Sequence, residues 1–135
     1  MNEEDMIKNA LKVLTSDGTF QIDQINYYEK SFGNAIAVLK SNSRVDARFI
    51  KDRGDFWCEI GQAGDWYFIE DVFSFVGVTG IAKSGDFVDF ITETSTIIKK
   101  NLTPIFKAFD AKHSKDTKSK IKEMATKRAM EMFGI

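Results

Sequence analysis

The sequence has one cysteine, one proline and one histidine, and these scarcities exclude several kinds of protein. Because Cys58 has no second cysteine to pair with, no intramolecular disulfide can form, which is typical of a reducing compartment. One thiol and one imidazole, at His113, cannot assemble the usual zinc ligand sets. We therefore expect neither a metal nor a cofactor.

Long apolar segments are also missing. No stretch reaches the roughly 18 continuous apolar residues that a membrane span requires. The N-terminal segment MNEEDMIKNALKVL is acidic and amphipathic, and it lacks the basic and apolar regions of a secretory signal. We expect a cytoplasmic protein without membrane contact, folded as a single α+β domain over residues 1–135.

Basic residues are scarce in the first part of the chain, and acidic residues are scarce in the last part. Residues 1–96 contain 9 Lys and Arg against 16 Asp and Glu, a net charge of −7. Residues 97–135 contain 10 against 4, a net charge of +6. The overall charge of −1 therefore conceals a polarised chain, which indicates either a basic partner for the front or an acidic partner for the back.

The hydrophobic pattern predicts a helix within residues 1–18, followed by a sheet over residues 19–61. The parity of the apolar residues changes near Gln24, which indicates a β-bulge. Gly33-Asn34 and Ser41-Asn42-Ser43 are turn sequences. The result is a four-stranded antiparallel β-meander, with strands at 19–29, 34–40, 44–52 and 55–61.

Three or four helices packed on the sheet are predicted to follow, over residues 65–111 and 112–135. Asp65 is expected to cap a short, mostly buried helix that Gly77 closes, and Ser84 to cap a long one. Pro104 either kinks that long helix or, with Thr103, begins a new one. The segment 112–135 is predicted to end the chain as a basic helix.

The charged turn Asp52-Arg53-Gly54 joins the third and fourth strands, and two turns fit it. A two-residue turn would place Asp52 opposite Asp55 and force Arg53 to positive φ. A three-residue turn with Gly54 as a left-handed bulge residue would place Lys51 opposite Asp55 instead, and we favour it. In that register neither face of the sheet is cleanly polar. Helices are then expected on one face, and the C-terminal helix, a second copy of the chain or a partner protein on the other.

No catalytic site is expected. A charged cluster of Asp52, Arg53 and Asp55 is explained better by turn chemistry than by catalysis. Cys58 is predicted to be a buried apolar residue, because no histidine lies near it in the sequence to serve as a base. We therefore expect a protein that is not an enzyme.

Acidic and large aromatic residues crowd the segment from the third strand onward. Such a mixture suits docking to a basic protein, since charge speeds the encounter and aromatic rings anchor the contact. The candidate partner-binding residues are Asp46, Arg48, Asp55, Trp57, Glu59, Asp65, Trp66, Glu70 and Asp71.

Lysines cluster near the C-terminus, where they could contact a phosphate backbone. The candidate nucleic-acid contacts are Lys112, Lys115, Lys118 and Lys122. A solvated helix is the simpler interpretation, because the sequence pI is about 5.9 and no known nucleic-acid motif is present.

The segments FGNAIAVLKS, RVDARFIKDRGDFWCEIG and DWYFIEDVFSFVG occur in this order within residues 32–77. This order resembles a group of small bacterial α+β proteins that carry a Gly-Asn turn, an Asp-Arg-Gly hairpin, an acidic-aromatic strand and a Trp-led helix. The matching positions in this chain are Gly33, Asn34, Asp52, Arg53, Gly54, Glu59, Ile60, Gly61 and Trp66. Proteins of this build look like the immunity proteins of bacterial toxin–immunity systems. The resemblance implies a non-enzymatic, toxin-neutralising role, and the basic C-terminus does not belong to it.

Overall fold

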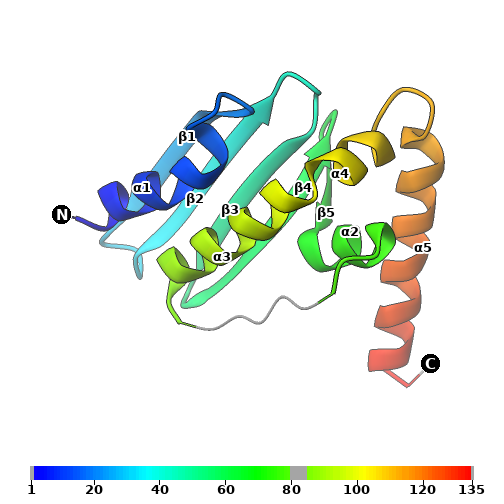
Figure 1. The fold of residues 1–135 in the computed structure, drawn as a ribbon. Coiled ribbons are helices and arrows are strands. Elements are labelled where there is room, and N and C mark those ends of the chain that lie inside the picture. The colour runs from blue at the N-terminus through cyan, green and yellow to red at the C-terminus, as the bar shows by residue number, and fades with distance from the viewer. Residues whose placement is uncertain (1, 80–84, 135) are drawn as a thin grey trace.

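The computed structural model describes residues 2–79 and 85–134, and its helices and strands lie within those ranges. The chain forms a helix, a sheet of five strands and four further helices over the described residues (Figure 1). These are α1 (Glu3–Thr15), β1 (Phe20–Tyr28), β2 (Asn34–Ser41), β3 (Asp46–Asp52), β4 (Asp55–Gln62), β5 (Asp65–Phe68), α2 (Ile69–Val76), α3 (Phe87–Lys100), α4 (Leu102–Ala108) and α5 (Ser114–Met132). The α+β class with an N-terminal helix and an antiparallel sheet is confirmed, and the expected strand count was one too low.

The sheet is a meander with strand order β1-β2-β3-β4-β5, and every pair is antiparallel. The register between β1 and β2 shifts between Ile22 and Gln24, so the predicted bulge is confirmed. It moves the rest of β1 by one residue, which explains why the apolar parity of this strand changes midway.

The prediction of a three-residue turn between β3 and β4 was wrong. Asp52 pairs with Asp55 and Lys51 with Phe56, so the turn has two central residues, Arg53 and Gly54. Their φ angles of 52° and 86° are both positive, as in the type I′ turns whose twist matches a hairpin. The register differs from the expected one by one residue, which reassigns the side chains of β4 to opposite faces.

The segment from Asp65 is a strand rather than the start of a helix, because it forms a second tight hairpin with β4. Gln62 pairs with Asp65 across a turn in which Ala63 and Gly64 have φ angles of 53° and 85°. The expected helix therefore begins four residues later, at Ile69, and Asp65 does not cap it. Gly77 closes this helix in the left-handed conformation, as predicted.

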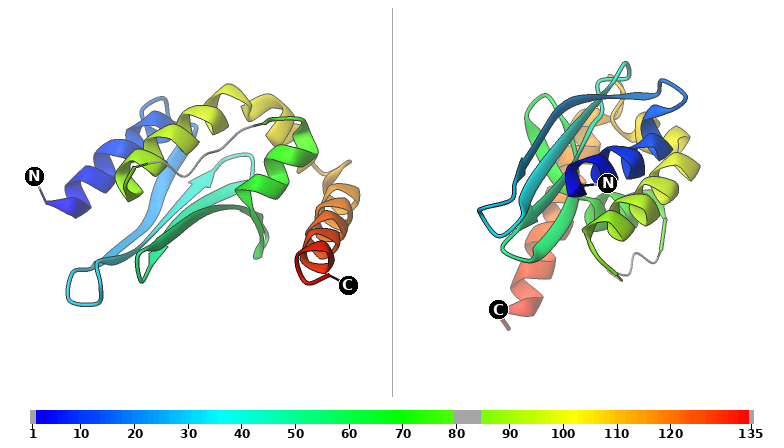
Figure 2. Two further views of the ribbon diagram at one scale, coloured as in Figure 1. Left: turned by 90° about the horizontal axis from the view of Figure 1, so that it is seen from below. Right: turned by 90° about the vertical axis from the view of Figure 1, so that its left-hand side faces the viewer.

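One face of the sheet, which we call the inner face, carries the core. Alternate residues of β2, β3 and β4 are buried on it, and α3 packs against them through aromatic pairs such as Phe49 with Phe90. Helices α1 and α3 lie side by side over this face (Figure 2). The buried strand residues on this face include Ala35, Ala37, Leu39, Ala47, Phe49, Cys58 and Ile60.

Helix α3 begins with a capping box formed by Asp86 and Asp89, each side chain accepting from the other residue's backbone N–H. The predicted cap Ser84 lies outside the described residues. Pro104 stands in the first turn of α4, where a missing N–H costs no intrahelical hydrogen bond. The interpretation that a new helix begins near Pro104 is therefore confirmed, but its N-cap and first residue are Asn101 and Leu102 rather than Thr103 and Pro104.

Helix α5 contacts α2 beyond the β5 edge of the sheet (Figure 1). Only Thr117 and Ile121 are buried among its described residues, and residues 126–134 are largely exposed. Among the described residues, ion pairs of Lys118 with Asp65 and of Arg128 with Asp71 attach it to the rest of the molecule.

Candidate functional site

The second face of the sheet, which we call the outer face, has no described helix packed over it. In the left view of Figure 2 the helices α1 and α3 lie on one side of the strands, while α5 stands beyond the β5 edge. The side chains of this face come from alternate residues of β2 to β5. They are Ile36, Val38, Arg48, Ile50, Trp57, Glu59, Trp66 and Phe68.

Two cross-strand rows organise the outer face. The first row runs through Ile36, Ile50 and Trp57, which pair directly from β2 to β3 to β4. All three side chains are only partly buried, so apolar surface remains in contact with water. A solvated sheet face normally carries polar residues in such positions, so this apolar row is a candidate interaction surface.

The second row holds a charged and aromatic cluster. Arg48 on β3 pairs with Glu59 on β4, with 2.7 Å between Nε and Oε1. The guanidinium carbon of Arg48 lies 4.1 Å from the centroid of the Trp66 ring, a cation–π contact. Trp66 itself rests on Gly61, where a Cβ would lie 2.5 Å from its ring. Any side chain at position 61 would therefore displace the ring that Arg48 stacks on.

A groove lies where the outer face meets α5. Its volume is about 450 Å³, and its lining comes from β4, β5, α2 and α5. The lining residues are Asp55, Trp57, Phe68, Glu70, Arg128 and Met132. Phe68 is 45% exposed and Met132 is 73% exposed, so the apolar walls are open to solvent.

The structure divides the nine predicted partner-binding residues into groups. Asp55, Trp57 and Glu70 line the groove, and Arg48, Glu59 and Trp66 form the stacked cluster next to it. Asp46 lies on the outer face at the start of β3, opposite Gly61. Burial raises the pKa of the Asp46 carboxyl, and nearby Asp23 adds to this, while Lys40 acts in the opposite direction.

The other two predicted acids are engaged within the molecule. Asp65 accepts from Lys118 at 3.0 Å, so its charge is matched by α5. Asp71 is buried, with a side chain only 8% exposed, and it binds Arg128. The acidic front and the basic back of the chain are thus partly complementary to each other.

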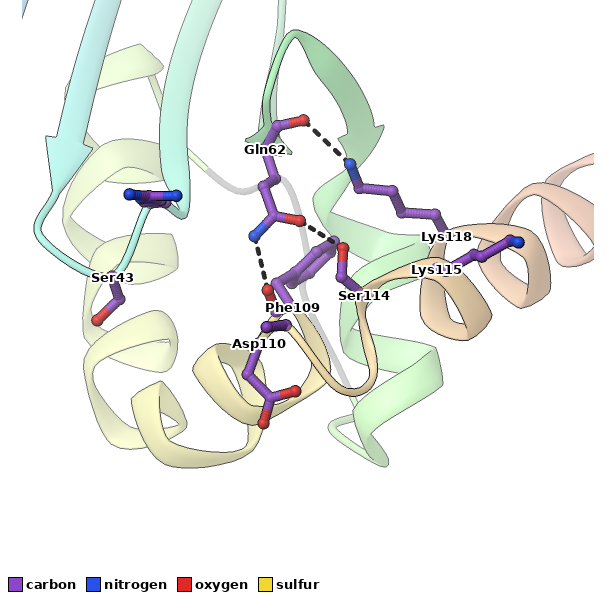
Figure 3. Close-up of a pocket in the computed structure, with 9 residues that line it drawn as sticks. Ser43, Gln62, Phe109, Asp110, Ser114, Lys115 and Lys118 are labelled. Carbon is purple, nitrogen blue, oxygen red and sulfur yellow. Dashed lines mark hydrogen bonds between the residues drawn. The ribbon is translucent and has the colours of Figure 1, made fainter.

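Of the four lysines predicted to contact nucleic acid, Lys118 is the one with a strong internal role. It donates to Asp65 and, at 3.3 Å, to the backbone carbonyl of Gln62. Figure 3 shows Lys118 pointing toward Gln62 and Lys115 extending along α5, away from Gln62. Lys112, Lys115 and Lys122 are exposed, so the segment keeps three lysines in solvent.

The pocket drawn in Figure 3 is organised by Gln62, at the end of β4. Its side-chain amide donates to the Phe109 carbonyl at 2.6 Å, and its carbonyl oxygen accepts from the Ser114 hydroxyl at 2.6 Å. Asp110, also at this pocket, is held by the ring nitrogen of His113 at 2.8 Å. Because these hydrogen bonds join β4, the end of α4 and the start of α5, the pocket marks the junction that positions α5.

The residues considered for catalysis occupy structural positions. Cys58 is fully buried on the inner face, where burial first, then Glu70 and Glu59, raise the pKa of its thiol well above the ordinary range. Asp52, Arg53 and Gly54 form the exposed hairpin turn. Within residues 2–79 and 85–134, no three His, Cys, Asp or Glu side chains gather closely enough to hold a metal ion. Among the helices that the structure describes, none has the length and apolarity to cross a bilayer.

Several residues of the site were not predicted. Ile36, Val38 and Ile50 were taken as ordinary strand residues, although their alternation with buried Ala35, Ala37 and Phe49 was visible in the sequence. That alternation separates the two faces only when the correct hairpin register is known. Met132 was not among the predicted site residues, yet it is exposed at the groove.

Comparison with protein-family models, with curated proteins and with solved structures found no match to this chain.

Proposed function

We propose that this protein is a non-enzymatic binding module that holds a partner protein against the outer face of its sheet. The observation that supports the proposal is the apolar row of Ile36, Ile50 and Trp57 on a face that no described helix covers. Fully burying a large apolar side chain contributes about 1.5–3 kcal/mol. A partner that covers this row buries these side chains, so their burial favours the complex over the separate proteins.

The arrangement around the row suits a protein partner rather than a small molecule. Tryptophan and arginine dominate the binding energy of protein interfaces when they stand at the centre of the contact. In this chain Arg48 is already held by Glu59 and by the Trp66 ring it stacks on, and Trp57 stands in the apolar row of the same face. Such a pre-ordered side chain loses little conformational entropy when a partner arrives.

The charge around the outer face favours a basic partner. Asp55 and Glu70 line the groove beside Trp57, and Asp46 lies on the same face at the start of β3, whereas the cation Arg48 is paired with Glu59. Complementary charge raises the association rate and selects against acidic proteins. The most specific form of the proposal follows the resemblance of residues 32–77: the partner is a basic toxin domain whose working surface this chain covers.

Growth rescue tests this proposal. A basic toxin domain encoded beside this gene would be expressed in cells with the wild-type chain or with Ile50→Glu. The wild-type chain should restore growth, and Ile50→Glu should weaken binding by at least about tenfold and fail to restore it. Lys12→Glu, at an exposed position on α1, is the matched control and should rescue like the wild type. Equal rescue by Ile50→Glu would contradict the assignment of the outer face.

The alternative function is contact with a nucleic-acid backbone, and it is favoured by the exposure of Lys112, Lys115 and Lys122. Deleting residues 112–135 is a poor test, because Thr117 and Ile121 of α5 are buried. Replacing the three exposed lysines by glutamine leaves the helix packing intact. Salt-dependent binding to short duplexes that disappears in this triple variant would establish the alternative. Toxin rescue unaffected by the same substitutions would establish the protein-binding role separately.

A further inference from the structure

We infer that the groove between the outer face and α5 receives a lysine or arginine side chain of the partner. This inference rests on the proposed function, because the side chain belongs to the protein that covers the outer face. It adds a specific recognition element to that surface: an apolar slot for an aliphatic stem, with the Glu70 carboxylate placed for the cationic head.

The walls of the groove match an aliphatic stem. Trp57 and Phe68 come from neighbouring strands, and Met132 approaches from α5. All three present apolar surface to a volume of about 450 Å³, which is ample for one long side chain and the backbone that carries it. Lysine and arginine bury their methylene groups along such surfaces while their charged heads stay near water. The face of an indole ring also attracts a cation directly.

The charges of the groove match a cationic head. Asp55 and Glu70 both line it, one from the start of β4 and the other from the first turn of α2. Arg128, the cation among the described lining residues, binds the buried carboxylate of Asp71, so its charge is already balanced. Glu70 is exposed, so it presents a carboxylate to the groove beside an arginine whose charge is already balanced. This carboxylate would repel an anionic side chain and attract a cationic one.

The groove forms only when α5 is packed in place, because one of its walls belongs to this helix. Arg128 ties the helix to α2 one turn before Met132, and Lys118 ties the same helix to Asp65 near its start. These attachments position α5 beside α2 and β5, so the wall of the groove that Met132 provides depends on them.

Peptide binding monitored by NMR tests the inference without requiring the natural partner. The probes are three blocked tripeptides, with leucine on each side of arginine, citrulline or glutamate. Citrulline matches arginine in shape and lacks its charge. The reporters are the indole N–H signal of Trp57, identified with Trp57→Phe, and the ε-methyl signal of Met132. The arginine peptide should shift both signals at millimolar concentration, and the other two peptides should bind at least about threefold more weakly.

Substitutions of single acids test whether the arginine peptide binds in the groove. Glu70→Gln, at an exposed position, should weaken the arginine peptide about threefold, whereas Glu4→Gln on α1 should leave its affinity unchanged. The inference is overturned if citrulline binds as well as arginine, if Glu70→Gln has no effect, or if the Trp57 and Met132 signals do not move. If the peptide test fails but outer-face variants still prevent toxin rescue, the groove inference is contradicted and the proposed function is still supported. The opposite result is also informative: if the arginine peptide binds selectively but outer-face variants still rescue growth, the groove is supported and the proposed function is contradicted.

Discussion

The side-chain oxygen of Asn34 accepts a hydrogen bond from the backbone N–H of Arg53, with 2.8 Å between the two atoms. Asn34 begins β2, and Arg53 stands at the tip of the hairpin formed by β3 and β4. The amide nitrogen of Asn34 also lies 3.3 Å from the Asp52 carboxylate. A neighbouring strand thus supports a turn in which Arg53 adopts an unfavourable positive φ, and this support fixes the register that creates the outer face.

Replacing Arg53 by asparagine should stabilise the protein. A non-glycine residue at positive φ is strained, whereas asparagine tolerates this conformation and Asn-Gly is the preferred pair for a type I′ turn. The expected gain is about 0.5–1 kcal/mol in the free energy of unfolding, measured by urea denaturation. Asn34→Ala should have the opposite effect, because it removes the hydrogen bond to the turn. A destabilised Arg53→Asn variant would show that the turn is not of type I′.

Removing Arg128 should loosen α5. Its partner Asp71 is a buried carboxylate, and Arg128→Ala would leave that charge without its cation. The expected loss is on the order of 1–3 kcal/mol, with faster hydrogen exchange along α5 than along the sheet. Lys120→Ala is the control, since Lys120 pairs with Asp116 on the surface of the same helix. That variant should change stability by less than about 0.5 kcal/mol. Equal effects of the two substitutions would contradict the role of Asp71 as an anchor for α5.

The thiol of Cys58 should be unreactive in the folded protein. Its burial on the inner face excludes reagents and raises its pKa, so little thiolate exists at about pH 8. Alkylation by iodoacetamide should be at least about a hundredfold slower in buffer than in concentrated urea. The measurement is a time course followed by mass spectrometry. Rapid labelling in buffer would indicate an accessible, activated cysteine and would reopen the question of catalysis.

The loop before α5 should weaken in acid. Hydrogen bonds from the ring and backbone of His113 are the main reason that the pKa of the Asp110 carboxyl lies below its ordinary value of 3.8. A lowered folded-state pKa means that the carboxylate stabilises the fold above the unfolded pKa, and that this stabilisation is lost as the pH falls through the folded pKa. Asp110→Asn should therefore be less stable than the wild type at about pH 7. The two unfolding curves should converge at low pH, and a difference that persists there would contradict the assignment.

The sequence was most informative where local chemistry decided the structure. The bulge near Gln24 followed from the parity of apolar residues alone, and Gly77 followed from its place after an apolar run. The two hairpin turns were harder, because Arg53 and Ala63 adopt positive φ against their own preference. Contacts from elsewhere in the fold, such as that of Asn34, outweigh local propensity at such positions.

The candidate site illustrates the same limit. The acidic and aromatic residues of β4, β5 and α2 were selected by type, and type alone did not separate exposed Glu70 from buried Asp71. Their division depends on which side of α2 meets α5, a tertiary contact without a local signal. The apolar row was overlooked because a one-residue error in register places Trp57 on the wrong face.

Photo-crosslinking is the most direct test of the claim that the outer face binds a partner protein. A benzoylphenylalanine would replace Ile50 on the outer face or Lys12 on α1, and the cells that carry this gene would be irradiated. We expect the chain labelled at position 50 to form one discrete adduct with a basic protein, and the chain labelled at position 12 to form none. Adducts of equal yield from both positions, or an adduct only from position 12, would contradict the account.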